Sequence, residues 1–163
     1  MISRKLKKMS NLYEEKLKKY IRDNNVKAEH ITFNKSCHSV EEATKTANVN
    51  IDEFVKNICM IDSNENLIVA IVKGEDRAST SRVEKALNIE KPRTATPNEI
   101  LQKTGYPCGG TPSFGYNAKF LIDPRIMEKE FVYTGGGSEN SLIKISTKEL
   151  QKVNNGEIVR IRK

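Results

Sequence analysis

Two apolar runs in the middle of the chain, residues 55–61 and 67–72, place the strongest constraint on the fold. Both are rich in β-branched residues, and five polar residues, 62–66, separate them. Runs of this length and composition are typical of buried strands, and a short polar connection between two of them is typical of a hairpin. The sequence therefore predicts a buried β-hairpin at the centre of the protein.

Helix and strand patterns surround this hairpin. Residues 1–24 carry apolar residues at helical spacing, and residues 96–99 (Thr-Pro-Asn-Glu) combine an N-cap, a proline and a capping-box glutamate for a helix that ends at Gly105. Further helices are expected after the capping pattern at Ser39, near residues 80–88, and after Ser146. Strands are expected at 118–122, 131–134, 142–145 and 158–161.

These elements predict one mixed α/β domain. A chain of 163 residues is long enough to bury a sizeable core. We expect a central mixed or antiparallel sheet of about six strands surrounded by helices. Residues 1–24 are predicted to form an amphipathic helix that packs on the body, and residues 25–163 to form the body itself.

Basic charge is concentrated at the N-terminal end. Residues 1–28 hold nine Lys or Arg and three acidic residues, so they carry +6 of the net charge of +7. Charge gathered on one element is typical of proteins that bind polyanions, nucleic acid above all, although an ordinary solvated helix face is the alternative. The predicted RNA contacts are Lys16, Lys18 and Lys19.

Several classes of function lack their signatures. No apolar run approaches the ~20 residues of a membrane span, and the first residues do not resemble a signal peptide. Three cysteines without CxxC spacing favour a reducing, cytoplasmic setting. The histidines, His30 and His38, and the cysteines do not stand at metal-ligand spacing, and nucleophile-elbow and P-loop motifs are absent. We predict no metal and no cofactor, with His38 the better candidate for a general base and an ordinary polar or capping role as its alternative.

The glycine-rich run at residues 105–116 is the strongest functional signal. It contains four glycines and two prolines, a density that favours a rigid backbone pocket presenting N–H groups to a polar ligand. A second signal is Lys56, which stands inside an apolar run, where an ammonium group needs a partner or a shifted pKa. Lys56 either lies at a strand edge with its head in water or lies beside the glycine run, where it could hold a carbonyl, an ester or a phosphate.

The order of several short motifs resembles one family. They are the Asn-Val-Asn-Ile-Asp-Glu-Phe-Val stretch that ends at Lys56, the Thr-Gly-Tyr-x-x-Gly-Gly-x-x-x-x-Gly pattern at 104–115, Phe-Leu-Ile-Asp at 120–123, Tyr-Thr-Gly-Gly-Gly at 133–137 and Ile-Lys-Ile-Ser at 143–146. Together they span roughly residues 25–155 and resemble the YbaK/prolyl-tRNA synthetase-associated editing-domain family. The chain departs from the family pattern at Ser113, where many relatives have the proline that stands here at Pro112, and at Tyr116, where several have histidine.

The resemblance implies hydrolysis of misacylated tRNA, typically tRNA(Pro) that carries alanine, cysteine or a similar small residue. It implies that Lys56 holds the substrate and that the backbone N–H groups of Gly109, Gly110 and Thr111 stabilise the oxyanion. The base would be a substrate group, the ribose hydroxyl or a cysteine thiol. The expected partners are the acceptor end of the tRNA and an aminoacyl-tRNA synthetase. The residues assigned to substrate binding are Pro112, Ser113, Gly115, Tyr116, Gly135, Gly136 and His38.

Two other functions fit the same residues. One is a non-catalytic module that binds an RNA 3′ end or recruits a synthetase, with the basic helix contacting phosphates. The other is a hydrolase of a different small activated ester, for which the basic helix would be incidental.

Overall fold

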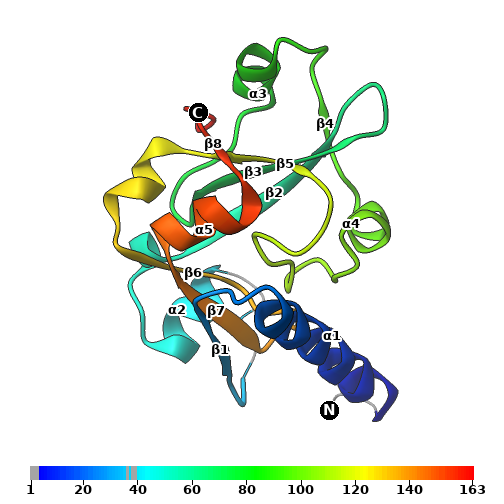
Figure 1. Cartoon of the computed structure of the whole chain (residues 1–163), viewed down its shortest axis with the longest axis vertical. Coiled ribbons are helices and arrows are strands. Elements are labelled where there is room, and N and C mark those ends of the chain that lie inside the picture. The colour runs from blue at the N-terminus through cyan, green and yellow to red at the C-terminus, as the bar shows by residue number, and fades with distance from the viewer. Residues whose placement is uncertain (1–3, 36, 38–39) are drawn as a thin grey trace.

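A computed structural model describes residues 4–35, 37 and 40–163, so the predicted cap Ser39 and the candidate His38 lie outside the described residues. Its elements follow in chain order (Figure 1): α1 (Arg4–Asp23), β1 (Ala28–Thr32), α2 (Val40–Ala47), η1 (Ile51–Glu53), β2 (Val55–Ile61), β3 (Leu67–Lys73), α3 (Thr80–Leu87), β4 (Arg93–Thr94), α4 (Pro97–Thr104), β5 (Lys119–Ile122), η2 (Pro124–Glu128), β6 (Phe131–Gly135), β7 (Ser141–Ser146), α5 (Thr147–Asn154) and β8 (Glu157–Ile158). The mixed α/β class is confirmed.

The predicted hairpin is confirmed and forms the centre of the larger sheet. Strands β2 and β3 pair antiparallel along their full length, from Val55 opposite Lys73 to Ile61 opposite Leu67. The sheet order is β4-β2-β3-β5-β8, with β3 parallel to β5 and β5 parallel to β8. Every residue of β3 is buried, which is the environment that its continuous apolar sequence predicts.

The prediction of a single sheet is wrong, because the strands form two. Strands β1, β7 and β6 make a separate antiparallel sheet in the order β1-β7-β6. Strand β1 has a weak sequence signal because its residues, Ala-Glu-His-Ile-Thr, are all at least partly exposed. Strand β4 has only two residues, and the last predicted strand is shorter and earlier than expected, at Glu157–Ile158.

The large sheet buries side chains on both faces. One face packs against the small sheet, α1 and α4, in a core that includes the fully buried Tyr106 and Phe114. The other face packs against Val83 of α3 and Ile161 near the C-terminus. Since side chains alternate along a strand, neighbouring residues of β2 belong to different cores.

Local sequence signals position the glycine-rich segment. Thr96 and Glu99 form the predicted capping box at the start of α4. Gly105 ends the helix with φ of 80°, a left-handed conformation that glycine adopts without strain. The chain therefore turns at the predicted residue and enters the segment 105–116.

Helix α1 is anchored on the body by its apolar face. Leu17 is completely buried in the main core, and Tyr13, Tyr20 and Ile21 pack beside it. Gly115 lies against the ring of Tyr20, and Gly137 lies against the main chain of Tyr13. Helix α1 thus packs on both glycine-rich segments of the chain. The division between residues 1–24 and 25–163 stays a prediction.

Candidate functional site

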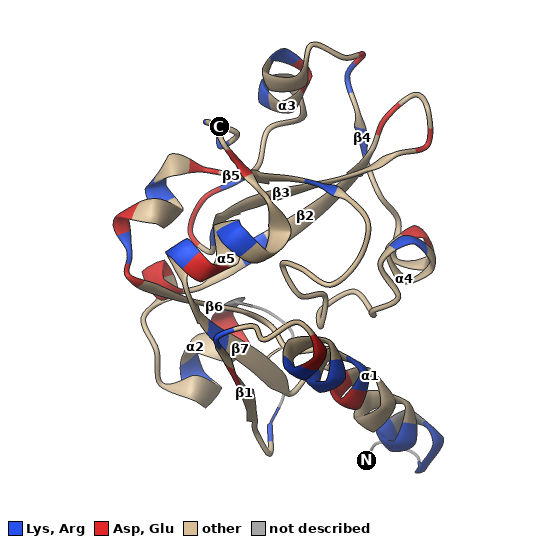
Figure 2. Cartoon of the chain, in the orientation of Figure 1, with Lys and Arg blue, Asp and Glu red and all other residues tan. Residues whose placement is uncertain are grey.

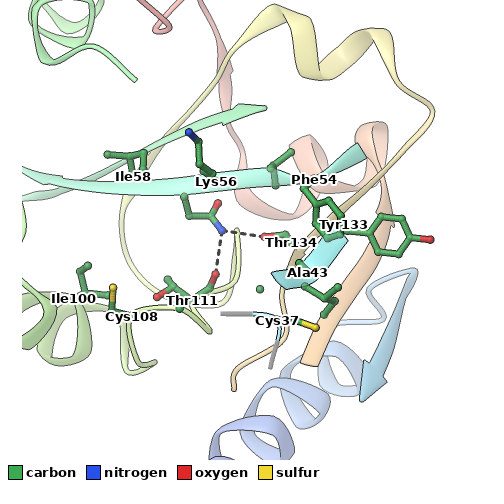
Figure 3. Close-up of a pocket in the computed structure, with 15 residues that line it drawn as sticks. Cys37, Ala43, Phe54, Lys56, Ile58, Ile100, Cys108, Thr111, Tyr133 and Thr134 are labelled. Atoms are coloured by element: carbon green, nitrogen blue, oxygen red, sulfur yellow. Dashed lines mark hydrogen bonds between the residues drawn. The ribbon is translucent and has the colours of Figure 1, made fainter. Parts of the chain in front are cut away.

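A cavity of about 180 Å³ lies between the edge of β2, the segment 105–116 and strand β6 (Figure 3). We call residues 105–116 the glycine loop and residues 135–137 the glycine turn. The cavity brings together the middle of β2, the glycine loop and the start of the glycine turn, which are far apart in sequence. Its lining residues are Cys37, Ala43, Phe54, Val55, Lys56, Asn57, Ile58, Ile100, Cys108, Gly109, Thr111, Tyr133, Thr134, Gly135 and Leu142.

The cavity exists because β4 covers only part of the edge of β2. The two strands pair at Met60 and Ile61, and the N–H of Ala95 donates to the carbonyl of Cys59 at 2.9 Å. The alternation of a strand directs the main chain of Asn57, two residues earlier, to the same edge. This edge of β2 therefore forms a wall of the cavity.

The glycine loop and the glycine turn pack backbone against backbone. A Cβ added to Gly135 would lie 2.7 Å from the carbonyl carbon of Thr111, and one added to Gly110 would lie 2.7 Å from that of Gly137. The N–H of Gly137 also donates to the carbonyl of Gly110 at 2.8 Å. Side chains would force the segments apart, so glycine is required at this contact.

Asn57 connects both segments to β2. Its Nδ2 donates to the carbonyl of Thr111 at 3.0 Å and to Oγ1 of Thr134 at 2.9 Å (Figure 3). Its Oδ1 accepts from the hydroxyl of Ser113 at 2.6 Å. The hydroxyls of Ser113 and Thr134 lie 2.7 Å apart and complete the network. Ser113 and Thr134 are almost completely buried. Buried, satisfied networks of this kind fix the geometry of the segments that they join.

The N–H groups of the glycine loop divide into two kinds. The N–H of Gly110 donates to the carbonyl of Pro107 at 3.0 Å, so the turn itself uses it. Within the described part of the chain, the N–H groups of Gly109 and Thr111 donate to no acceptor, and both residues line the cavity. Gly109 has φ of 93°, a conformation that a residue with a side chain rarely adopts. The loop thus offers two N–H donors to a ligand.

Lys56 is half-buried and forms part of the cavity wall. In Figure 3 its side chain leaves β2 on the opposite side from the amide that binds Thr111 and Thr134, as strand alternation requires. Burial lowers the pKa of Lys56, and the positive charge of Arg77 adds to this effect, whereas Asp76 opposes it. No carboxylate of the described residues lies within ion-pair distance of Lys56. Its ammonium group is therefore a poorly solvated charge that an anionic or carbonyl ligand would stabilise.

The structure divides the predicted site residues into two groups. Lys56, Gly109, Thr111 and Gly135 line the cavity, whereas the other described members are not among its lining residues. The hydroxyl of Tyr116 donates to the carbonyl of Pro112 at 2.7 Å, and burial holds the pKa of Tyr116 well above its usual value.

The remaining predicted residues also have internal partners. Gly136 is buried, and its carbonyl lies 2.8 Å from Nε2 of His30. Gly115 packs on α1, and Ser113 belongs to the Asn57 network.

Sequence reasoning missed Asn57 and Thr134. A polar asparagine beside Lys56 in an otherwise apolar run was an available signal for the first. Nothing in the sequence indicated that Thr134 of β6 reaches Ser113 of the glycine loop, because the two residues lie in segments that meet only in the folded protein. The sequence also did not indicate that Phe54, Ile58 and Ile100 line the cavity, since an apolar residue in a strand or helix is expected to belong to the hydrophobic core.

The lysines predicted to bind RNA all have partners within the protein. Lys16 donates to the carbonyl of Gly105 at 3.2 Å and lies 4.6 Å from the centre of the Tyr106 ring. Lys18 pairs with Glu15 at 3.3 Å, and Lys19 pairs with Asp23. Within the described residues, no group of three or more His, Cys, Asp or Glu is placed to hold a metal ion, and no helix is long and apolar enough to cross a bilayer.

Comparison with known proteins places the chain in a family. The sequence model of the aminoacyl-tRNA editing domain matches residues 34–153, and the chain belongs to this family. An uncharacterized protein of Bacillus subtilis (strain 168), YwhH, is 26% identical over 122 residues, which cover 74% of this chain and 77% of that protein. A proline–tRNA ligase of Anaeromyxobacter sp. (strain Fw109-5) is 27% identical over 78 residues, 47% of this chain but 14% of the ligase.

Solved structures share the fold over nearly the whole chain. The hypothetical protein APE2540 superimposes with a TM-score of 0.84 at 25% identity, and the match covers 91% of this chain and 99% of APE2540. A candidate trans-editing enzyme for prolyl tRNA synthetase superimposes with a TM-score of 0.85 at 18% identity, and the match covers 93% of this chain and 97% of that enzyme. The expected fold, that of an editing domain, is therefore confirmed.

Proposed function

We propose that the protein hydrolyses the ester bond of misacylated tRNA, as a trans-editing deacylase acting on tRNA(Pro) that carries alanine, cysteine or a similar small residue. The observation that carries this proposal is the composition of the cavity wall: two glycine-loop residues whose N–H groups donate to no acceptor among the described residues line the same cavity as the half-buried Lys56. Membership of the aminoacyl-tRNA editing domain family supports it.

The size and lining of the cavity favour an aminoacyl group with a small, uncharged side chain. Its volume of about 180 Å³ is below the ~300–1,000 Å³ that is usual for drug-sized ligands, so a nucleotide would stay outside. Phe54, Ile58 and Ile100 contribute apolar walls. A charged side chain would lose its hydration in such a pocket without gaining a counter-charge among the described lining residues, apart from Lys56.

The chemistry requires little from side chains. Water attacks the ester carbonyl carbon, a tetrahedral oxyanion forms, and the bond to the ribose oxygen then breaks to release the amino acid and the tRNA. The N–H groups of Gly109 and Thr111 would donate to the oxyanion, and one such donor is commonly worth about 3 kcal/mol of transition-state stabilisation. Lys56 would hold the ester carbonyl or the terminal adenosine.

The proton would move through the substrate itself. The vicinal ribose hydroxyl would take a proton from the attacking water as it passes its own to the leaving oxygen. Burial and the negative charge of Glu42 raise the pKa of the Cys37 thiol, which lines the cavity, to about 11, so this thiol stays protonated and is a weak nucleophile. Proton transfer through the substrate's own hydroxyl is consistent with the cavity wall, whose described residues include no histidine, aspartate or glutamate.

The test is the release of free amino acid from tRNA(Pro) charged separately with alanine, cysteine, serine and proline. Wild type should hydrolyse at least one mischarged species and spare Pro-tRNA(Pro), and Lys56→Ala should lose this activity while it still binds tRNA. Lys91→Ala, at an exposed lysine far from the cavity, is the matched control. Equal activity of Lys56→Ala and wild type would refute the role of Lys56.

The described part of the cavity wall holds no histidine or carboxylate, which favours one alternative, a non-catalytic module that holds the 3′ end of a charged tRNA. The same assay separates the two functions. A binding module would protect the ester in all four charged tRNAs, so release would not exceed the rate without protein.

A further inference from the structure

The first half of α1 projects beyond the body and carries unpaired positive charge (Figure 2). We call its four cationic residues the basic end: Arg4, Lys5, Lys7 and Lys8. All four are exposed, and no acidic residue precedes Glu14. The ion pairs of α1 lie in its second half, at Lys18 and Lys19. Within the described part of the chain, the basic end forms no ion pair, so its charge is available to a partner.

The basic end faces away from the protein core. At about 100° per residue, its four side chains occupy an arc of about 160° centred opposite Tyr13 and Leu17, which dock the helix on the body. The cations therefore form one continuous solvent-facing surface. This arrangement is not needed for packing, because the face that packs carries none of them.

These charges also oppose the stability of the helix that carries them. Positive side chains near a helix N-terminus are repelled by the positive end of the helix dipole. The first turn of α1 contains no acidic residue that would offset this effect. A feature that costs local stability and contributes nothing to the core is expected to serve an interaction.

The anchoring of α1 holds the basic end at a fixed distance from the cavity. Tyr13 contacts the glycine turn and Lys16 contacts the glycine loop, and these two segments line the cavity. From Tyr13 back to Arg4, the rise of about 1.5 Å per residue gives about 14 Å along the helix axis. A rigid helix thus connects the site to a cationic surface outside it.

We propose that the basic end binds the phosphate backbone of the tRNA acceptor stem while the 3′ end occupies the cavity. The proposal rests on the proposed function for the identity of the RNA. It replaces Lys16, Lys18 and Lys19, whose charges are partnered, as the RNA-contacting residues of α1. Phosphate groups are the expected ligand for two reasons. The four positive side chains have no nearby carboxylate among the described residues, so their charge complements a polyanion, and their spacing along the helix suits the regular spacing of phosphates along a nucleic-acid strand. Since these contacts carry no sequence information, the basic end adds affinity and leaves substrate choice to the cavity.

Binding of uncharged tRNA(Pro) between about 50 and 200 mM salt tests this proposal directly. The variant is K5A/K7A/K8A. The control is R82A/K85A/K91A, which also removes three positive charges, but from exposed residues in and after α3, on the far side of the molecule (Figure 1). The first variant should bind about 10- to 100-fold more weakly, with a salt slope smaller by about 3, as expected for three lost phosphate contacts. The control should stay close to wild type. A melting temperature equal to or above that of wild type should accompany the loss, because the helix dipole is relieved.

A second measurement separates this proposal from the deacylase function. Hydrolysis of an amino acid esterified to the trinucleotide CCA, which has no stem, should be unaffected in K5A/K7A/K8A. If no substrate is hydrolysed, the proposed function fails while the tRNA-binding result still decides the role of the basic end. Equal loss in both triple variants would mean that only net charge matters and would overturn the proposal. Unchanged tRNA affinity would also overturn it, and binding of the wild type but not the variant to prolyl-tRNA synthetase would then identify a protein as the partner of the basic end.

Discussion

The substitution Asn57→Ala tests whether the hydrogen-bond network of Asn57 positions the glycine loop. The amide of Asn57 makes three hydrogen bonds, to the carbonyl of Thr111, the hydroxyl of Thr134 and the hydroxyl of Ser113. Alanine removes all three and leaves the carbonyl of Thr111 without its side-chain donor. The loop then loses its direct connection to β2 next to the two N–H groups that face the cavity.

The expected loss of stability follows from the number of bonds. A hydrogen bond contributes a net ~1 kcal/mol, so three give about 3 kcal/mol of unfolding free energy. For a domain of this size, each kcal/mol lowers the melting temperature by roughly 2–4 °C, which predicts a decrease of about 6–12 °C. If the loop moves by about 1 Å, deacylation should fall by about 100-fold, because catalysis by oriented donors is sensitive to such displacements.

The assay is thermal unfolding combined with a double-mutant cycle. Asn57→Ala, Ser113→Ala and the double variant should show a coupling of about 1 kcal/mol, because each single change breaks the same 2.6 Å bond. Asn24→Ala is the control, since Asn24 is exposed and makes one side-chain bond, to the carbonyl of Tyr20. A decrease below about 2 °C for Asn57→Ala, or strictly additive effects in the cycle, would refute the reasoning.

Two further predictions concern the walls of the cavity. Lys56→Met should abolish deacylation, because the proposed substrate contact is lost. It should also raise the melting temperature, because burial lowers the pKa of Lys56 and so disfavours its charged form in the folded protein. A lower melting temperature would show that the ammonium group has a stabilising partner. Gly135→Ala should destabilise the protein by about 1–3 kcal/mol in chemical denaturation, because its Cβ would meet the main chain of Thr111, which cannot rotate away. Gly156→Ala is a useful comparison, since the three atoms nearest to its Cβ would be side-chain atoms of Ile122 and Asn154, and equal costs at both positions would contradict a special role of the backbone contact.

Local signals in the sequence were sufficient for most individual elements. The capping box of Thr96 and Glu99 and the stop at Gly105 depend on residues within one or two turns, so the sequence contains all that determines them. The hairpin of β2 and β3 is similar, because its pairing follows from two apolar runs and a short turn. Strand β1 was missed for the opposite reason, since its half-exposed residues acquire their partner only across the chain, in β7.

Single residues of the site divide in the same way. Lys56 was predicted because a lysine inside an apolar run is unusual wherever the chain folds. Tyr116 and Ser113 were assigned to substrate binding from their place in a motif, but in the structure both have internal hydrogen-bond partners, Pro112 and Asn57. Proximity to a functional glycine in sequence did not determine which side of the loop a side chain occupies.

The sequence by itself determined the helices with strong caps, the central hairpin, the position of the glycine loop and the unusual environment of Lys56. Each depends on propensity, periodicity or turn chemistry within a few residues. Only the tertiary structure decided that Gly110 and Gly135 meet and that β4 leaves an edge of β2 uncovered. It also decided that Lys16, Lys18 and Lys19 have partners, while the basic end forms no ion pair with the residues that the structure describes. These features join residues from distant segments, and their energies arise from packing and hydrogen bonds that do not exist until the chain has folded.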